Sequence, residues 1–161
     1  IDPKTVSFSC ICSDDVKRRC GEVIQATLAE YGVTMNLESM DLATYLSTAG
    51  EGNFDTCIGG CTSSEGLGFV EYKYTSKMIG GSNWTRTNDA YIDGMDDKAS
   101  QTLDAAERAK MVEEMVAYPQ DLCPQVPTYS SDVVRAYNSD LQGYQFNASG
   151  NTYWHGVSWA E

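Results

Sequence analysis

The alternation of short apolar runs with helical patterns in the first sixty residues limits the folds that this chain can adopt. Three segments, 5–12, 33–40 and 54–61, are rich in β-forming residues, and two helical patterns, 16–31 and 42–50, separate them. Repeats of this kind form sheets whose strands are joined by crossover helices. The first half therefore predicts an α/β fold with a β-α-β-α-β start.

Residues that cap helices support these boundaries. Ser13 or Asp14 can cap the first helix, and Asp41 stands just before the second. Gly32 follows the last apolar position of the first helix, where glycine commonly ends a helix in the left-handed conformation. We therefore expect two well-delimited helices between the three strands.

The second half is less regular. Residues 67–88 read as a loop with one helical turn at most, and residues 89–100 read as a helix. Asp104 and Glu107 form a capping-box pattern that opens a further helix, which Pro119 and Pro124 are expected to close. The remaining residues read as extended segments followed by an irregular, aromatic tail, with no linker that would divide the chain.

Charge and length exclude several classes of protein. The chain has 161 residues and a net charge of −12, and its basic residues form no cluster. A surface of this kind repels nucleic acid, so no nucleic-acid partner is expected. No apolar run is long enough to span a bilayer. One globular domain with a core of its own is the expected form.

Six cysteines offer an alternative function. Cys10, Cys12, Cys57 and Cys61 lie at the ends of two predicted strands, where four thiolates could bind a metal ion. Their spacing lacks the knuckle pattern of structural zinc sites. A cysteine nucleophile would need a base, and His155 is the only histidine. A thiol- or metal-dependent α/β domain therefore stays open as the second hypothesis.

A third hypothesis rests on aspartates. Asp14 and Asp15 follow the first strand and Asp55 lies near the third, as in a phospho-receiver domain. Asp55 stands at the start of its strand, however, and not at the end as in a receiver, and no lysine closes the later segment 125–131. Helix capping by Asp14 is the simpler interpretation.

Three segments together resemble one family. Residues 36–61, 88–116 and 121–146 are similar, in this order, to stretches of the family 5 extracellular solute-binding proteins, the peptide, dipeptide and nickel receptors of ABC importers. The positions that match the family in the first segment are Asp41, Thr44, Tyr45, Leu46, Gly52, Phe54, Asp55 and Gly59.

The resemblance implies a periplasmic-binding-protein-like (type II) fold, in which two lobes close on a ligand. Residues 1–161 would form the C-terminal lobe, a mixed sheet flanked by helices, without enzymatic activity or a cofactor. The first lobe, the signal peptide and a lipid-anchor cysteine would lie upstream. The expected location is extracytoplasmic, and the expected partners are that lobe, the permease subunits of an ABC transporter, and a peptide or other small organic ligand.

The resemblance also suggests ligand-binding residues. In the family the third strand ends at the cleft, and the residues after it contact the ligand. The corresponding residues here are Gly59, Gly60, Cys61, Thr62, Ser63 and Glu65, with Trp84 and Arg86 added from a later loop. Two of them depart from the family pattern, because Gly60 replaces a tryptophan and Ser63 replaces an acidic residue of the peptide receptors. We therefore expect either that Glu65 takes the place of the missing acidic residue or that the ligand is not a simple peptide.

Overall fold

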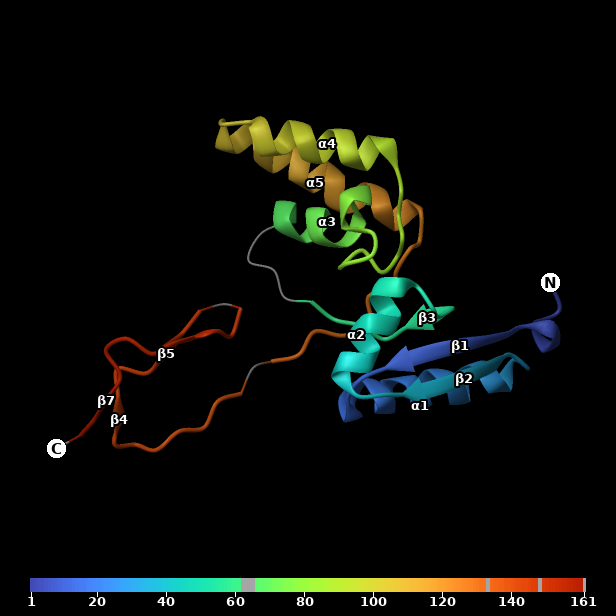
Figure 1. Cartoon of the computed structure of the whole chain (residues 1–161), viewed down its shortest axis with the longest axis horizontal. Coiled ribbons are helices and arrows are strands. Elements are labelled where there is room, and N and C mark those ends of the chain that lie inside the picture. The colour runs from blue at the N-terminus through green and yellow to red at the C-terminus, as the bar shows by residue number, and fades with distance from the viewer. Residues whose placement is uncertain (62–65, 133, 148, 161) are drawn as a thin grey trace.

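The computed structural model describes residues 1–61, 66–132, 134–147 and 149–160, and the chain folds into an α/β unit, a helical unit and a C-terminal tail (Figure 1). The elements of the α/β unit are β1 (Ser7–Cys12), α1 (Asp15–Glu30), β2 (Thr34–Ser39), α2 (Leu42–Glu51) and β3 (Thr56–Cys57). The strands form a parallel sheet in the order β2-β1-β3. The predicted β-α-β-α-β start is confirmed.

The two helices cover opposite faces of this sheet. On one face, Gly21 of α1 brings the helix so close to β2 that an added Cβ would lie 2.7 Å from Leu37. On the other face, Ile11 of β1 packs with Tyr45 and Ala49 of α2 in a buried cluster. The α/β unit is therefore a three-layer arrangement, and the α/β class is confirmed.

The predicted caps are present. Asp14 accepts a hydrogen bond from the Lys17 N–H at 2.9 Å, and Asp41 accepts two at the start of α2. Gly32 and Gly52 have φ of +84° and +78°, the left-handed conformation that ends a helix.

The helical unit packs around its own core. It contains α3 (Gly66–Tyr74), a 3₁₀ turn (Ser76–Met78), α4 (Ala90–Gln101) and α5 (Ala105–Asp121). The buried residues of its hydrophobic core are Val70, Tyr74, Ile92, Ala99, Met111 and Met115. This core is separate from that of the α/β unit, so the two units are stabilised largely independently.

One prediction for this region is wrong. The segment predicted as a loop forms the nine-residue helix α3, because Val70 and Tyr74 lie one turn apart and pack against α4 and α5. The end of α5 falls at Asp121, between the two prolines that were predicted to close the helix. Pro119 itself lies within the last turn, where its ring is buried.

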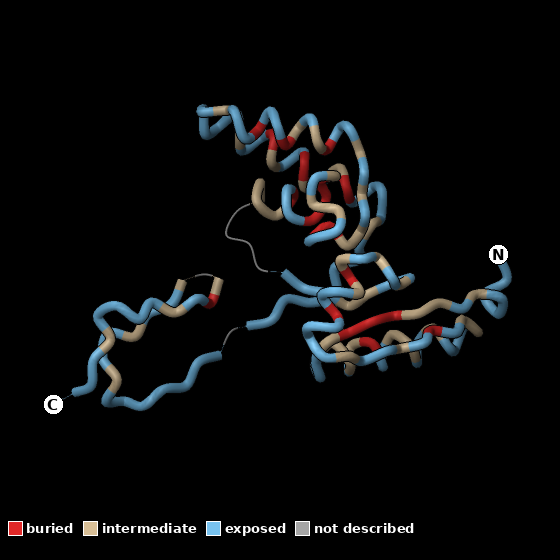
Figure 2. Tube along the Cα trace, in the orientation of Figure 1, coloured by how far each residue is buried: buried red, intermediate tan, exposed pale blue. Residues whose placement is uncertain are grey.

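The tail forms two short antiparallel pairs. β4 (Leu141–Gln142) pairs with β7 (Ser158–Trp159), and β5 (Gln145–Phe146) pairs with β6 (Thr152–Tyr153). The tail stands apart from the two other units, and most of its residues are exposed (Figures 1 and 2). Within the described residues, no helix has the length and apolarity needed to cross a membrane.

Candidate functional site

A groove of about 600 Å³ lies where β3 leaves the sheet, between the α/β unit and the helical unit. Ligands of open α/β sheets commonly bind beyond the carboxyl ends of the strands, which is where this groove begins. It is lined by the β3 exit (Thr56–Cys61), by Phe69 and Lys73 of α3, by Trp84 and Thr85, and by the extended segment 123–129.

Tyr45 fixes the path of the chain at the β3 exit. Its hydroxyl donates a hydrogen bond to the Ile58 carbonyl at 3.2 Å. Burial raises the pKa of the Tyr45 phenol, so the hydroxyl remains a donor at neutral pH. The first residues of the candidate site therefore extend from a rigidly held point.

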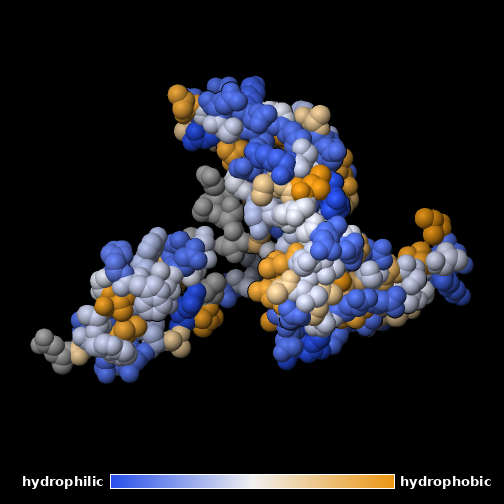
Figure 3. Space-filling view, viewed as in Figure 1, coloured by the Kyte–Doolittle hydropathy of each residue, from blue (hydrophilic) through white to orange (hydrophobic). Residues whose placement is uncertain are grey.

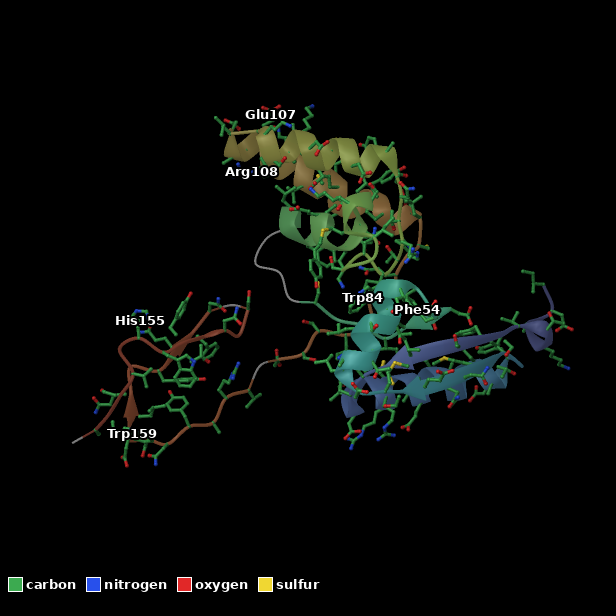
Figure 4. The ribbon with its side chains drawn as sticks, in the orientation of Figure 1. Phe54, Trp84, Glu107, Arg108, His155 and Trp159 are labelled. Carbon is green, nitrogen blue, oxygen red and sulfur yellow. The ribbon has the colours of Figure 1, made fainter. Side chains whose placement is uncertain are left out.

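Trp84 forms a wall of the groove against this exit. Its ring packs edge-on against Tyr45, with 5.4 Å between ring centroids, and its indole Nε1 donates to the Gly81 carbonyl at 3.0 Å. Figure 4 shows Trp84 beside Phe54 at the junction of the two units. The predicted residue Trp84 thus lies at the groove.

Asn83 stabilises the loop that carries Trp84 through hydrogen bonds of its side chain. Its buried side-chain amide donates to the carbonyls of Thr75 and Thr87 at 2.9 and 2.8 Å. Because both bonds cross the base of the loop, Trp84 is presented on a fixed scaffold and not on a mobile connection.

The two glycines of the β3 exit have different environments. A Cβ on Gly59 would lie 2.8 Å from the Trp84 ring and 3.2 Å from the Tyr45 hydroxyl. Gly59 is therefore required by internal packing. Nothing lies within 4 Å of the corresponding position on Gly60, and Cys61 is exposed. Gly60 is thus the position of the pair that is open to a ligand.

The remaining predicted residues divide into two groups. Thr62, Ser63 and Glu65 lie outside the described residues. Arg86 is not at the groove: its guanidinium contacts the Glu51 carbonyl and the Gly52 backbone, next to the C-terminus of α2.

Lys73 is the groove residue that the sequence pattern missed. It stands in the last turn of α3 and is only 7% exposed. Its Nζ lies 4.5 Å from the centroid of the Trp84 ring. Desolvation lowers the pKa of Lys73, against the opposing influence of the Cys61 and Cys57 thiols. The segment was read as a loop, so nothing in its pattern placed a lysine in the groove.

The thiol hypothesis finds little support in the geometry. All six cysteines are free thiols, and burial raises the pKa of Cys10 and Cys57, which disfavours the thiolate that binds metals. Among the residues that the structure describes, no three potential metal ligands lie together.

The phospho-receiver hypothesis fails on position. Asp55 accepts hydrogen bonds from the Ser9 N–H and hydroxyl at 2.8 and 2.9 Å, before the start of β3. Asp14 caps α1 beyond the carboxyl end of β1. Asp55 thus lies beside the middle of β1 and Asp14 beyond its end, and among the described residues no three potential metal ligands lie together.

Comparisons with known proteins support the fold and show what the chain is similar to. No family model matches the chain. Heme-binding protein A of Haemophilus influenzae is 27% identical over 143 residues, which make up 88% of this chain and 26% of that protein. The structure of HbpA2 from Haemophilus parasuis matches with a TM-score of 0.75 and 25% identity, over 99% of this chain and 33% of that one.

A third match has a peptide ligand. A dipeptide binding protein from Pseudoalteromonas sp. SM9913, in complex with Met-Leu, matches with a TM-score of 0.76 and 17% identity. The match covers 92% of this chain and 31% of that one. The chain thus spans about a quarter to a third of the proteins that it matches. Its structural neighbours are family 5 solute-binding proteins, and the chain corresponds to one part of such a protein.

Proposed function

We propose that residues 1–161 form the C-terminal lobe of a two-lobed extracytoplasmic receptor that delivers a solute to an ABC importer. Support comes from the proteins that the chain resembles, which are binding proteins and not enzymes. The Helicobacter pylori neighbour DppA, at 17% identity, is an ABC transporter-associated periplasmic binding protein in complex with a peptide. A lipid anchor, a signal peptide and contact with permease subunits belong to this proposal.

The observation that carries the proposal is the groove at the β3 exit. It combines an aromatic wall, Trp84, with an open glycine, Gly60, which lies three residues after β3, a strand that pairs only with β1 among the described residues. Glycine lets a ligand backbone approach closely, and an unpaired strand edge offers main-chain hydrogen bonds. A peptide or a peptide-like organic molecule suits both features.

The tail supports a second lobe. Trp154 and Trp159 are 68% and 66% exposed, and Tyr144 packs with Tyr137 and Trp154 in an aromatic cluster away from both units. The space-filling view shows hydrophobic residues on the tail and on the side of the α/β unit that faces it (Figure 3). Exposed apolar surface of this extent is typical of an interaction surface, and we assign it to the other lobe.

The binding mechanism is closure of the two lobes around the ligand. Contacts made by both lobes stabilise the closed state in proportion to the difference in affinity between the closed and open states. The residues of this lobe that we propose to contact the ligand are Gly60, Cys61, Thr62, Ser63, Glu65 and Trp84.

The first test is native mass spectrometry of the whole protein that carries this chain, purified without unfolding. Adducts at a series of peptide masses would support peptide cargo. One discrete non-peptide mass would refute it. Metal analysis before and after alkylation tests the thiol alternative in the same sample, since a stoichiometric metal that is lost on alkylation would favour that alternative.

A pair of glycine variants tests the location. Gly60→Trp should fill the groove without a clash, because nothing lies within 4 Å of the added Cβ, and it should reduce the adduct fraction. Gly94→Trp is the matched control, since Gly94 also has open space but lies on α4, away from the groove. Equal ligand loss in the two variants would place binding elsewhere.

A further inference from the structure

Lys73 is a buried cation beside the open part of the groove. The residue is 7% exposed and lines the groove together with Gly60 and Cys61. Its Nζ lies 4.5 Å from the Trp84 ring centroid and 5.3 Å from that of Tyr72. The two aromatic rings attract the ammonium group but carry no net charge to balance it.

No carboxylate of the described residues balances this charge. The ion pairs of the described part of the chain involve Lys17, Arg18 and Lys77, and none brings an Asp or Glu within 4.0 Å of Lys73. This is notable in a chain with 23 acidic and only 11 basic residues, in which a basic side chain has many possible partners. Burying the ammonium group of a lysine costs free energy, because the group loses its hydration, unless an anion lies beside it.

Among the described residues, the thiols of Cys57 and Cys61 also influence the charge of Lys73. Burial raises the pKa of Cys57, so this thiol is neutral at physiological pH. Desolvation lowers the pKa of Lys73. A bound anion would reverse the effect, because an opposite charge at short range favours the ammonium form.

We propose that Lys73, held against Trp84, is the anion-binding subsite of the groove and binds a carboxylate of the ligand. The ligand is then a small organic acid or a peptide whose free carboxyl group points toward α3. The inference depends on the proposed function of the groove and adds to it the charge and orientation of the ligand. The position of Lys73 in the last turn of α3 keeps the charge fixed beside the β3 exit.

The direct test is a pH titration of lysine ¹³Cε NMR signals in the whole protein, with sodium acetate compared with sodium chloride at equal ionic strength. The Lys73 signal is assigned by its absence from Lys73→Met. We expect acetate to raise its titration midpoint by about one pH unit or more. Lys98 is the matched control, because it also stands in the last turn of a helix but is exposed, and its midpoint should not change.

Two results of this titration would overturn the proposal. One is an equal midpoint for Lys73 in acetate and chloride. The other is an acetate response that appears only in Glu65→Gln, which would mean that a carboxylate of the chain itself already pairs with Lys73.

A second experiment separates this inference from the proposed function. Calorimetry of the whole protein compares trialanine with its C-terminal amide. We expect Lys73→Met to weaken binding of the free acid by about 10-fold or more and to leave the amide unchanged. Equal binding of acid and amide, unaffected by Lys73→Met, would refute the anion subsite while supporting a peptide groove. If neither trialanine nor its amide binds, while Lys73 still responds to acetate, peptide cargo is refuted but the anion subsite is supported.

Discussion

The contact between Gly59 and Trp84 predicts a sharp difference between neighbouring glycines. In Gly59→Ala the added methyl carbon would lie 2.8 Å from the Trp84 ring. The ring cannot easily move, because its Nε1 donates a hydrogen bond to the Gly81 carbonyl and the ring packs edge-on against Tyr45. Overpacking of this kind costs ~1–3 kcal/mol. Reduced freedom of the unfolded chain returns ~0.4–1 kcal/mol, so a net loss of about 1–2 kcal/mol is expected.

Gly60→Ala provides the control. Its methyl group would have open space, and the φ of neither glycine falls in the left-handed region, so only the gain from the unfolded chain remains. Urea unfolding of the 161-residue chain, followed by far-UV circular dichroism, should give a lower midpoint for Gly59→Ala and an equal or higher one for Gly60→Ala. A Gly59→Ala midpoint at or above that of Gly60→Ala would refute the packing argument.

Three further predictions concern other parts of the chain. Asp104→Ala removes the N-cap of α5 and should cost ~1 kcal/mol in urea unfolding, whereas Asp97→Ala, on an exposed face of α4, should cost little. Iodoacetamide should alkylate exposed Cys61 faster than Cys57, whose pKa is raised by burial. Equal alkylation rates, measured by peptide mapping, would contradict the burial of Cys57 at the β3 exit. Hydrogen bonds from Ser9 lower the pKa of Asp55, so the stability that Asp55 contributes should be fully present above pH ~4 and be lost as the pH falls further. A difference in unfolding free energy between the wild type and Asp55→Asn that persists in acid would count against this.

The first half of the chain was predictable because its signals are local. Asp41 and Gly52 bracket α2 within a few residues of sequence, and the apolar period distinguishes strands from helices. β3 was predicted as eight residues but pairs over Thr56–Cys57 alone. The length of a strand depends on how far its backbone can hydrogen-bond to the neighbouring strand, and the sequence alone does not show where that pairing stops.

The helix α3 was missed because tertiary packing outweighs its weak local preference. Gly66 and Gly68 lower the helix propensity of its first turn. Gly66 is nevertheless favourable in the fold, because an added Cβ would lie 2.5 Å from Val112 of α5. A contact over more than forty positions leaves no periodic signal, and the same reason explains why Lys73 was not predicted at the groove.

The candidate site shows the same limit in a single residue pair. Gly59 was predicted to make room for a ligand, but the structure shows that it makes room for Trp84, twenty-five positions later. Trp84 and Arg86 are two positions apart and were predicted together. In the structure Trp84 lines the groove, whereas the guanidinium of Arg86 lies against the C-terminus of α2.

The unequal exposure of the three tryptophans gives the protein a built-in spectroscopic reporter. Trp84 is half-buried between Tyr45 and the ammonium of Lys73, whereas Trp154 and Trp159 are largely exposed. Their emission should therefore separate into a blue-shifted component from the groove and a red-shifted component from the tail. Acrylamide quenches the exposed tail tryptophans and reaches Trp84 less freely. The emission that remains in acrylamide would therefore report the occupancy of the groove. The emission that acrylamide removes would report whether the tail is covered.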